Sequence, residues 1–330
     1  MNPSMNLAGL SSSGLGLLAG LSTAVLWTFT AVCFEASSRR LGSLAVNVLR
    51  LVVAAVLFTV LSLVRTGGLL PAALSQDAWF YLGLSGLIGF VVGDVLLFQA
   101  FMLIGARLSM LIYASVPLMT AMCGFVFLGE SMSGRALAGM ALTVAGIAIA
   151  VGGKPSPSKD GTGASARSRR TAGILMAFGG AAGQAAGLLL GKRGAIGLDS
   201  FAATQVRVLA GLVGFLAVLV VARKVRVLRD RLREAIAPSG THASGDPQQL
   251  RSLRRALLLM GLGALLGPFL GVSLGLLSTQ LLPAGTAATL MSIVPVLLIP
   301  VSALAFRERI FLVEIAGAVL AVSGVALLAG

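Results

Sequence analysis

The residues with the greatest chemical potential are a few polar side chains inside long apolar segments. Asp94 is the one acid deep within such a segment, and an ionised carboxylate at the centre of a bilayer costs about 2.5–3.5 kcal/mol on an insertion scale. A group this costly needs a partner, a proton or water. Asp94 is therefore a candidate for binding a coupling proton or cation, or a substrate amine. The equal alternative is a structural Asp that is hydrogen-bonded to backbone or to Tyr113, which is expected at a similar depth.

Two further pairs of polar side chains have the same spacing of 157 residues. Arg50 and Arg207 lie about six residues into their apolar segments, where a guanidinium group is able to hold a carboxylate or a phosphate with two hydrogen bonds. Their position favours the alternative, in which both side chains snorkel to the lipid headgroups. Trp27 and Gln184 lie within apolar segments and suit the wall of a cavity and ordinary packing equally well.

The composition indicates that these residues lie in a lipid bilayer rather than in a water-soluble protein. The 330-residue chain is 57% hydrophobic and 11% charged, whereas a soluble domain is about 25% charged. Residues 256–306 contain no Asp, Glu, Lys or Arg, and this length accommodates two helical spans of about 20 residues each. We therefore predict an all-α, multi-pass protein of the cell membrane (inner or plasma membrane). The net charge of +14 lies mostly in loops, so no nucleic-acid partner is expected.

Ten apolar segments are predicted to cross the membrane as helices. They are residues 14–34, 44–64, 79–101, 105–128, 134–152, 172–191, 200–222, 256–278, 285–306 and 312–330. Residues 153–171 are basic and rich in Gly, Ser and Pro, which predicts a flexible linker. The expected domains are a five-helix repeat in 1–152, this linker, and a second five-helix repeat in 172–330 with a basic loop insertion at 223–255.

The two halves are similar in sequence. A shift of 178 residues aligns Pro117 with Pro295 and Glu130 with Glu308, and each Glu follows its Pro by thirteen residues. Such similarity predicts an internal duplication. Because each copy has five spans, the second copy enters the membrane from the opposite face, which is the inverted repeat of many secondary transporters. The second copy has Val272 where the first has Asp94, so coupling at this position is expected in one copy only.

The repeated Pro and Glu residues predict two structural features. A Pro inside a helix removes a hydrogen bond and bends the axis, so the fourth and ninth spans are expected to bend at Pro117 and Pro295. Thirteen residues of helix rise about 20 Å, so Glu130 and Glu308 are expected at the membrane interface. There each Glu is expected to cap the next helix or to form an ion pair.

These features together resemble the EamA-type transporters of the drug/metabolite transporter superfamily. The resemblance rests on the ten spans, on Pro117 followed by Gly129-Glu130, on their counterparts in the second copy, and on residues 93–117, which are similar to the family's third and fourth spans. The chain departs from the family pattern at Arg307, which replaces a Gly, and in the long loop 223–255. The resemblance implies a secondary carrier, often an exporter of amino acids or other small metabolites. It also implies a central cavity lined by spans 1–4 and 6–9, with spans 5 and 10 outside.

Two other classes of function stay open, namely an integral-membrane enzyme acting on lipid and a scaffold for partner proteins. The sequence has no zinc-protease motif and no pair of intramembrane acids, and its one histidine, His242, lies in a polar loop. No catalytic residue, metal site or cofactor is therefore expected. Cys33 and Cys123 lie in apolar segments and are interpreted as small buried hydrophobes. The expected partners are a small-molecule substrate and the lipid bilayer, and the chain is expected to be a monomer or a homodimer.

The loops differ in positive charge. Loops after odd-numbered spans contain 19 Lys and Arg residues, and loops after even-numbered spans contain 4. The positive-inside rule then places both termini outside the cell, whereas the family resemblance implies both termini inside. Residues 221–237 place aliphatic side chains on one helical face and arginines on the other. This pattern predicts an amphipathic helix on an anionic leaflet or, equally, a solvated continuation of the seventh span.

Overall fold

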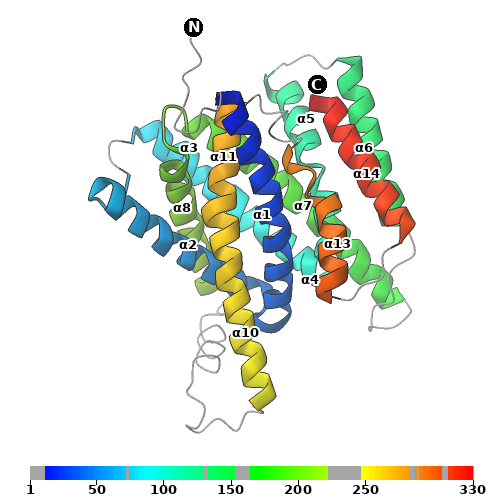
Figure 1. The fold of residues 1–330 in the computed structure, drawn as a ribbon, viewed down its shortest axis with the longest axis horizontal. Helices are drawn as coiled ribbons and strands as arrows, with labels where there is room; N and C mark the ends of the chain where they lie inside the picture. The colour runs from blue at the N-terminus through cyan, green and yellow to red at the C-terminus, as the bar shows by residue number, and fades with distance from the viewer. Residues whose placement is uncertain are drawn as a thin grey trace.

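The computed structural model describes residues 12–71, 74–128, 133–152, 164–221, 247–282, 287, 290–306 and 311–329. Every regular element within these ranges is a helix (Figure 1). In chain order the helices are α1 (Ser12–Leu41), α2 (Ser43–Thr66), α3 (Gln76–Gly86), the π-helix η1 (Leu87–Gly93), α4 (Asp94–Tyr113), α5 (Val116–Leu128), α6 (Gly134–Gly152), α7 (Ala164–Gly194), α8 (Ser200–Val221), α10 (Pro247–Ala264), the π-helix η2 (Leu265–Gly271), α11 (Val272–Leu281), α13 (Val294–Phe306) and α14 (Leu312–Ala329).

Within the described residues, six helical stretches are long and apolar enough to cross a membrane. They are Ser12–Leu41, Ser43–Thr66, Gln76–Tyr113, Arg167–Gly194, Ser200–Val221 and Arg251–Leu281. Shorter apolar helices occupy Leu137–Ala150, Val294–Ala305 and Leu312–Leu327. The prediction of a helical, multi-pass membrane protein is confirmed, and the count of ten crossings stays a prediction.

The fourth predicted span begins at a break in the helix and is interrupted once within its length. Gly105 has φ 79° and ψ 161°, a backbone conformation that favours glycine, and it separates the first part of α4 from residues 106–113. A turn at Ala114 and Ser115 then precedes α5. Pro117 lies in the first turn of α5, where a proline has no helical N–H bond to lose.

The second copy repeats this geometry. A turn at residues 292–293 precedes α13, and Pro295 lies in the first turn of that helix. The matching bends are therefore present, but each is a break just before the proline rather than a kink at it. The π-helices repeat as well, because η1 and η2 are seven residues each and begin 178 positions apart, at Leu87 and Leu265.

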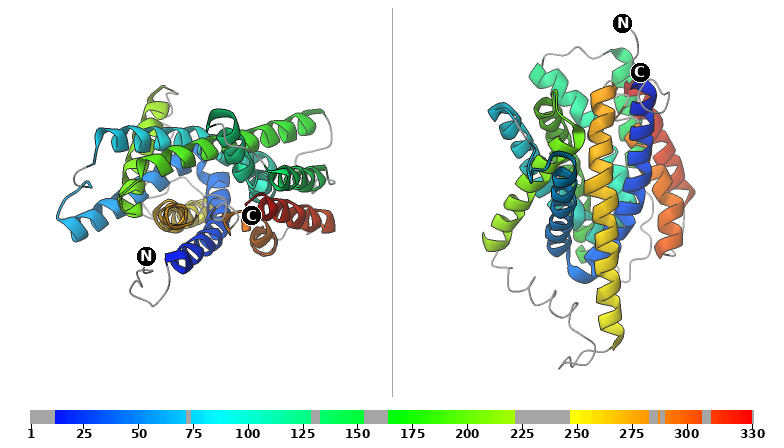
Figure 2. Two further views of the ribbon diagram at one scale, coloured as in Figure 1. Left: turned by 90° about the horizontal axis from the view of Figure 1, so that it is seen from above. Right: turned by 60° about the vertical axis from the view of Figure 1, so that its left-hand side comes forward.

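Helices of one copy pack mainly against helices of the other copy. The first span of each copy lies against the third span of the other, since α1 packs on α10, η2 and α11 while α7 packs on α3, η1 and α4. Helix α2 packs on α8, its counterpart. Helices α6 and α14 pack mainly on each other at one side of the bundle, as the resemblance implied (Figures 1 and 2). Glycines allow this close packing: a Cβ at Gly146 would lie 2.4 Å from the Ala321 nitrogen.

Helix α1 is longer than predicted and carries a buried acid near its end. Glu35, which the sequence placed in a loop after residue 34, is 1% exposed. Its Oε2 accepts a hydrogen bond from the Ala106 backbone N–H at 2.9 Å, and its Oε1 accepts one from Arg39 Nη2 at 2.6 Å. Glu35 therefore caps the helix that restarts after Gly105, so α1 supports the broken fourth span. Nearby, Arg107 forms an ion pair of 3.2 Å with Glu314 at the start of α14.

Candidate functional site

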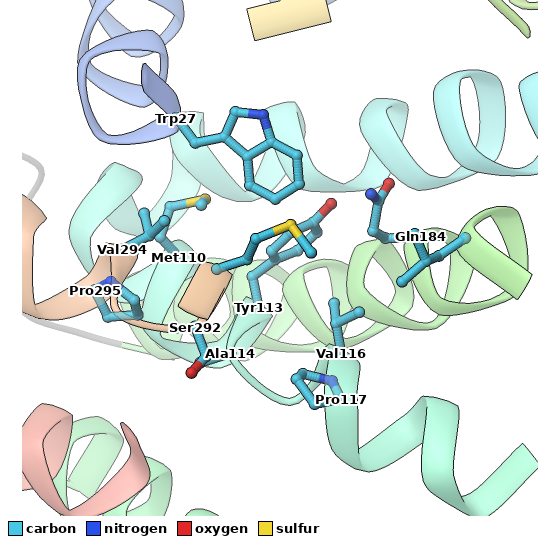
Figure 3. Close-up of a pocket in the computed structure, with 12 residues that line it drawn as sticks. Trp27, Met110, Tyr113, Ala114, Val116, Pro117, Gln184, Ser292, Val294 and Pro295 are labelled. Carbon is cyan, nitrogen blue, oxygen red and sulfur yellow. The ribbon is translucent and has the colours of Figure 1, made fainter. Parts of the chain in front are cut away.

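A pocket lies where α1, α4, α5, α7 and α13 meet (Figure 3). It has a volume of about 490 Å³, including the part that is open to the outside. Its lining residues are Trp27, Met110, Tyr113, Ala114, Val116, Pro117, Gln184, Leu188, Met291, Ser292, Val294 and Pro295. This lining is largely apolar with a few polar side chains, which is the usual composition of a site for small molecules.

Most of the lining consists of residues that the internal duplication relates to one another. Trp27 and Gln184 are equivalent under the shift of 157 residues. Four more pairs are equivalent under the shift of 178 residues: Tyr113 with Met291, Ala114 with Ser292, Val116 with Val294, and Pro117 with Pro295. The pocket is thus built from matching positions of both copies, at the two helix breaks that precede the prolines.

Three polar side chains face the pocket without internal partners. Trp27, Tyr113 and Gln184 point toward the same space (Figure 3), and each is half-buried. None of the three side chains has a hydrogen bond to any residue that the structure describes. The indole N–H, the phenol and the amide are therefore available to a bound molecule. The expected hydrogen bond from Tyr113 to Asp94 is not formed, although the two groups lie within electrostatic range.

Asp94 forms an ion pair with Arg50 instead. Arg50 Nη2 donates to Asp94 Oδ2, and Arg50 Nε donates to Asn47 Oδ1 at 3.0 Å. The Asn47 side chain donates in turn to the backbone oxygen of Asp94 at 3.4 Å. The Arg50 guanidinium also lies over the Phe98 ring, 4.9 Å from its centroid, a cation–π contact. The charge of Asp94 is therefore balanced within the protein.

Neither arginine snorkels, so that expectation is wrong. Arg50 is 4% exposed and Arg207 is 2% exposed, and both lie inside the bundle. Arg207 is buried because α8 packs closely on α3, where a Cβ at Gly86 would lie 2.1 Å from the Arg207 carbonyl oxygen. The two arginines flank Asp94, which lies within electrostatic range of both.

The candidate residues thus form two adjacent groups. Trp27, Tyr113 and Gln184 line the pocket, while Asp94 and the two arginines form a buried cluster beside it. The groups approach each other at Gly89, since Gln184 Oε1 and Arg207 Nη2 each lie 3.9 Å from the position of a Cβ on that residue.

Sequence reasoning missed some of the residues that build this region. The shift of 178 residues could have identified Met291 and Ser292, because they are the counterparts of Tyr113 and Ala114. Asn47 gave no comparable signal beyond its place one helical turn before Arg50. Glu130, Glu308 and residues 222–237 lie outside the described residues, so their predicted roles stay predictions.

Comparison with known proteins identifies a family that matches both halves of the chain. The model of the EamA-like transporter family matches residues 14–152 and again residues 171–330. No curated protein matches the sequence. A solved crystal structure shares 17% sequence identity and has a TM-score of 0.59 over 94% of this chain and 94% of its own. At this identity the likeness concerns the fold alone.

Proposed function

Because the chain belongs to the EamA-like transporter family, we propose that it is a secondary carrier that exports small polar metabolites, such as amino acids or related compounds. It does so by alternating access between two inverted repeats in the inner or plasma membrane. The general membrane-transporter assignment follows from the family. The substrate class, the direction and the mechanism are the proposal.

The observation that carries the proposal is the paired lining of the pocket. Ten of its twelve lining residues form five repeat-related pairs. In carriers with inverted repeats, the substrate binds at the interface of the repeats, and one repeat rocks against the other around that site. Breaks in the fourth span and in its counterpart, beside Pro117 and Pro295, supply the irregular backbone that such sites use.

Coupling to a proton is assigned to Asp94 within this proposal. Acids inside membrane helices commonly serve proton relays. The Arg50 partner supports this role, because protonation of Asp94 would break their ion pair and change the contact between α2 and α4. The counterpart Val272 cannot bind a proton, so one copy carries the coupling.

The carrier proposal is tested in two stages. Cells with and without the protein are first compared for metabolite release and for resistance to toxic analogues. The purified protein is then placed in vesicles that are preloaded with an unlabelled compound found in this way. External labelled compound should accumulate transiently above equilibrium, because a carrier exchanges its substrate across the membrane and a channel or an enzyme does not. Absence of this overshoot for every compound found would overturn the proposal.

A matched pair of cysteine variants ties transport to the pocket. In a Cys33→Ala, Cys123→Ala background, a thiol reagent attached at Ala114→Cys should block exchange, because Ala114 lines the pocket. Substrate should slow this labelling. The control is Val64→Cys on the outer face of α2, where Val64 is 78% exposed, and its labelling should leave exchange unchanged.

A further inference from the structure

Among the described residues, Arg207 has no hydrogen-bond or ion-pair partner, unlike its counterpart in the first copy. Arg207 is 2% exposed, and its Nε has no hydrogen-bond partner. The side chain forms no hydrogen bond or ion pair with any residue in the described part of the chain. The guanidinium makes a cation–π contact with Phe90, with Cζ 5.4 Å from the ring centroid. Cζ and Nε each lie 3.3 Å from the position of a Cβ on Gly191, which is also 3.0 Å from the Ser85 hydroxyl oxygen.

The sequence explains the difference between the two arginines. The partners of Arg50 are Asn47 and Asp94, and the equivalent positions beside Arg207 hold Thr204 and Val272. Thr204 uses its hydroxyl to donate to the backbone oxygen of Ser200 at 2.7 Å. The second copy therefore keeps the arginine and lacks both groups that would satisfy it.

The residues beside the two arginines differ as well. The Arg50 guanidinium lies 5.5 Å from the Phe34 ring centroid, and the residue equivalent to Phe34 is Gly191. An aromatic ring beside Arg50 is thus replaced by a residue without a side chain beside Arg207. The Arg207 guanidinium occupies this space together with the Ser85 hydroxyl, since Arg207 Cζ lies 3.3 Å and Ser85 Oγ 3.0 Å from the position of a Cβ on Gly191.

The buried cluster consequently carries excess positive charge. It holds two guanidinium groups and one carboxylate, and Asp94 is already paired with Arg50. An unpaired charge inside a membrane is strongly unfavourable unless a counter-ion or water satisfies it. Arg207 lies within electrostatic range of the pocket residue Tyr113, and its Nη2 approaches Gly89 together with the pocket residue Gln184. Asp94 is also within electrostatic range of Arg207 but is paired with Arg50, so a molecule in the pocket would supply the second counter-charge.

We propose that Arg207 binds the carboxylate group of the transported molecule while the apolar pocket beside it holds the molecule's apolar body. The inference rests on the proposed carrier function. A guanidinium group and a carboxylate match in shape and form two parallel hydrogen bonds. One negative charge balances the one unpaired guanidinium, whereas a phosphate dianion would leave a buried negative charge. Gln184 lies between the pocket and Arg207 and orients the carboxylate through its amide.

Binding can be measured directly, because the chain has two tryptophans and one of them lines the pocket. Trp79 is 41% exposed, so Trp79→Phe leaves Trp27 as the single reporter. The purified full-length protein is titrated with 4-methylpentanoate and with its neutral amide, 4-methylpentanamide, which has nearly the same shape. We expect a saturable change in Trp27 fluorescence with the anion, at concentrations on the order of 1 mM. The amide should bind about tenfold to hundredfold more weakly, as expected for the loss of hydrogen bonds to a charged group.

Variants at Arg207 assign the preference. Arg207→Gln should weaken binding of the anion by the same factor and leave binding of the amide unchanged, and Arg207→Lys should restore part of the preference. Lys192→Gln, an exposed cation on α7, is the matched control and should behave like the parent. Thermal unfolding of Arg207→Gln verifies that it is folded. We expect no loss of stability, because the variant removes an unpaired buried charge.

The proposal is overturned if the parent binds both probes equally, if neither probe gives a saturable change, or if Arg207→Gln keeps the preference for the anion. Failure of the carrier function is a separate outcome, since this titration needs no transport. Selective binding of the anion without counterflow would leave the site standing and reject the carrier. Counterflow of a neutral substrate that is unaffected by Arg207→Gln would support the carrier function and reject the carboxylate site at Arg207.

Discussion

At the scale of single residues, the Arg50–Asp94 pair is the contact most sensitive to charge. Asp94→Asn keeps the shape of the side chain and removes its charge, which leaves Arg50 unpaired. Losing one partner of a buried pair costs about 3–5 kcal/mol, so we expect a lower unfolding temperature in detergent. If Asp94 also carries the proton, the variant should insert into the membrane and lose transport driven by an imposed pH gradient.

A double variant separates these two effects. Removing both charges with Arg50→Met and Asp94→Leu should restore much of the stability, because apolar replacement of a buried pair is often neutral or stabilising. It should not restore coupled transport. Asp94→Asn with the transport rate and pH dependence of the parent would show that Asp94 is structural.

Gly86 offers a second prediction at this scale, because it fixes the depth of Arg207. A methyl group at Gly86 would lie 2.1 Å from the Arg207 carbonyl oxygen, whereas Gly83 on the same helix has no atom within 4 Å. We expect Gly86→Ala to lower the free energy of unfolding by about 1–3 kcal/mol. Gly83→Ala should be neutral or stabilise α3 by up to about 1 kcal/mol. Thermal unfolding of the two variants in one detergent compares them, and equal effects would contradict the close contact between α3 and α8.

At the scale of elements, the broken fourth span depends on a buried cap supplied by another helix. Glu35→Gln should weaken the hydrogen bond to the Ala106 N–H and the ion pair with Arg39, and we expect a loss of about 1–3 kcal/mol. The matched control is Asp199→Asn. Asp199 accepts bonds of 3.0 Å from the Phe201 and Ala202 N–H groups at the start of α8, but it is exposed, and Asn caps helices equally well. The control should therefore change the unfolding temperature little, and an equal loss in both variants would argue against a special role for Glu35.

The sequence predicted elements best where apolar length alone defines a helix. Residues 134–152 were predicted as a span, and α6 has these bounds; α8 likewise begins at the predicted Ser200. The prediction failed where neighbouring helices decide. The turn at Ala114 and Ser115 divides residues that were predicted as one span, and neither π-helix has a signal in the pattern of apolar residues. The break at Gly105, by contrast, falls at the predicted start of the fourth span.

The sequence predicted only part of the candidate site, because the repeat spacings are visible in it and the packing of helices is not. The repeat spacings related Trp27 to Gln184 and Pro117 to Pro295, and these residues do line one pocket. The pairing of Asp94 with Arg50 was not predicted, because it depends on how the second and third spans pack. Depth along a hairpin suggested Tyr113 as the partner, and depth alone does not specify which helix faces which.

At the scale of the whole molecule, the two copies share their helix contacts and differ in their charges. The helix breaks and π-helices recur at the same spacing, so the scaffold is nearly symmetric. The acid at Asp94 and the cap at Glu35 occur only in the first copy, since their counterparts are Val272 and Lys192. In the proposed mechanism, a symmetric scaffold would let each copy play the same part on opposite faces of the membrane. In the proposed carrier, the asymmetric charges would allow the two faces to respond differently to a proton and to a substrate.

The orientation of the bundle in the membrane is the last prediction. The first residues of α1 and the last residues of α14 lie at the same end of the bundle (Figure 1), so both termini are expected on one side. Loops on the opposite side contain 19 of the loop Lys and Arg residues against 4, and positive loops of this length stay in the cytoplasm. We therefore expect a reporter fused after Ser244 to be active only inside the cell, and one fused after Gly330 only outside.

The bias rests on the long loops 153–171 and 223–255, because the count without them is 5 against 4. Replacing their Lys and Arg residues with Gln should make the orientation mixed. A reporter after Ser244 that is active only outside would reverse the assignment in favour of the termini-inside orientation that the family resemblance implies.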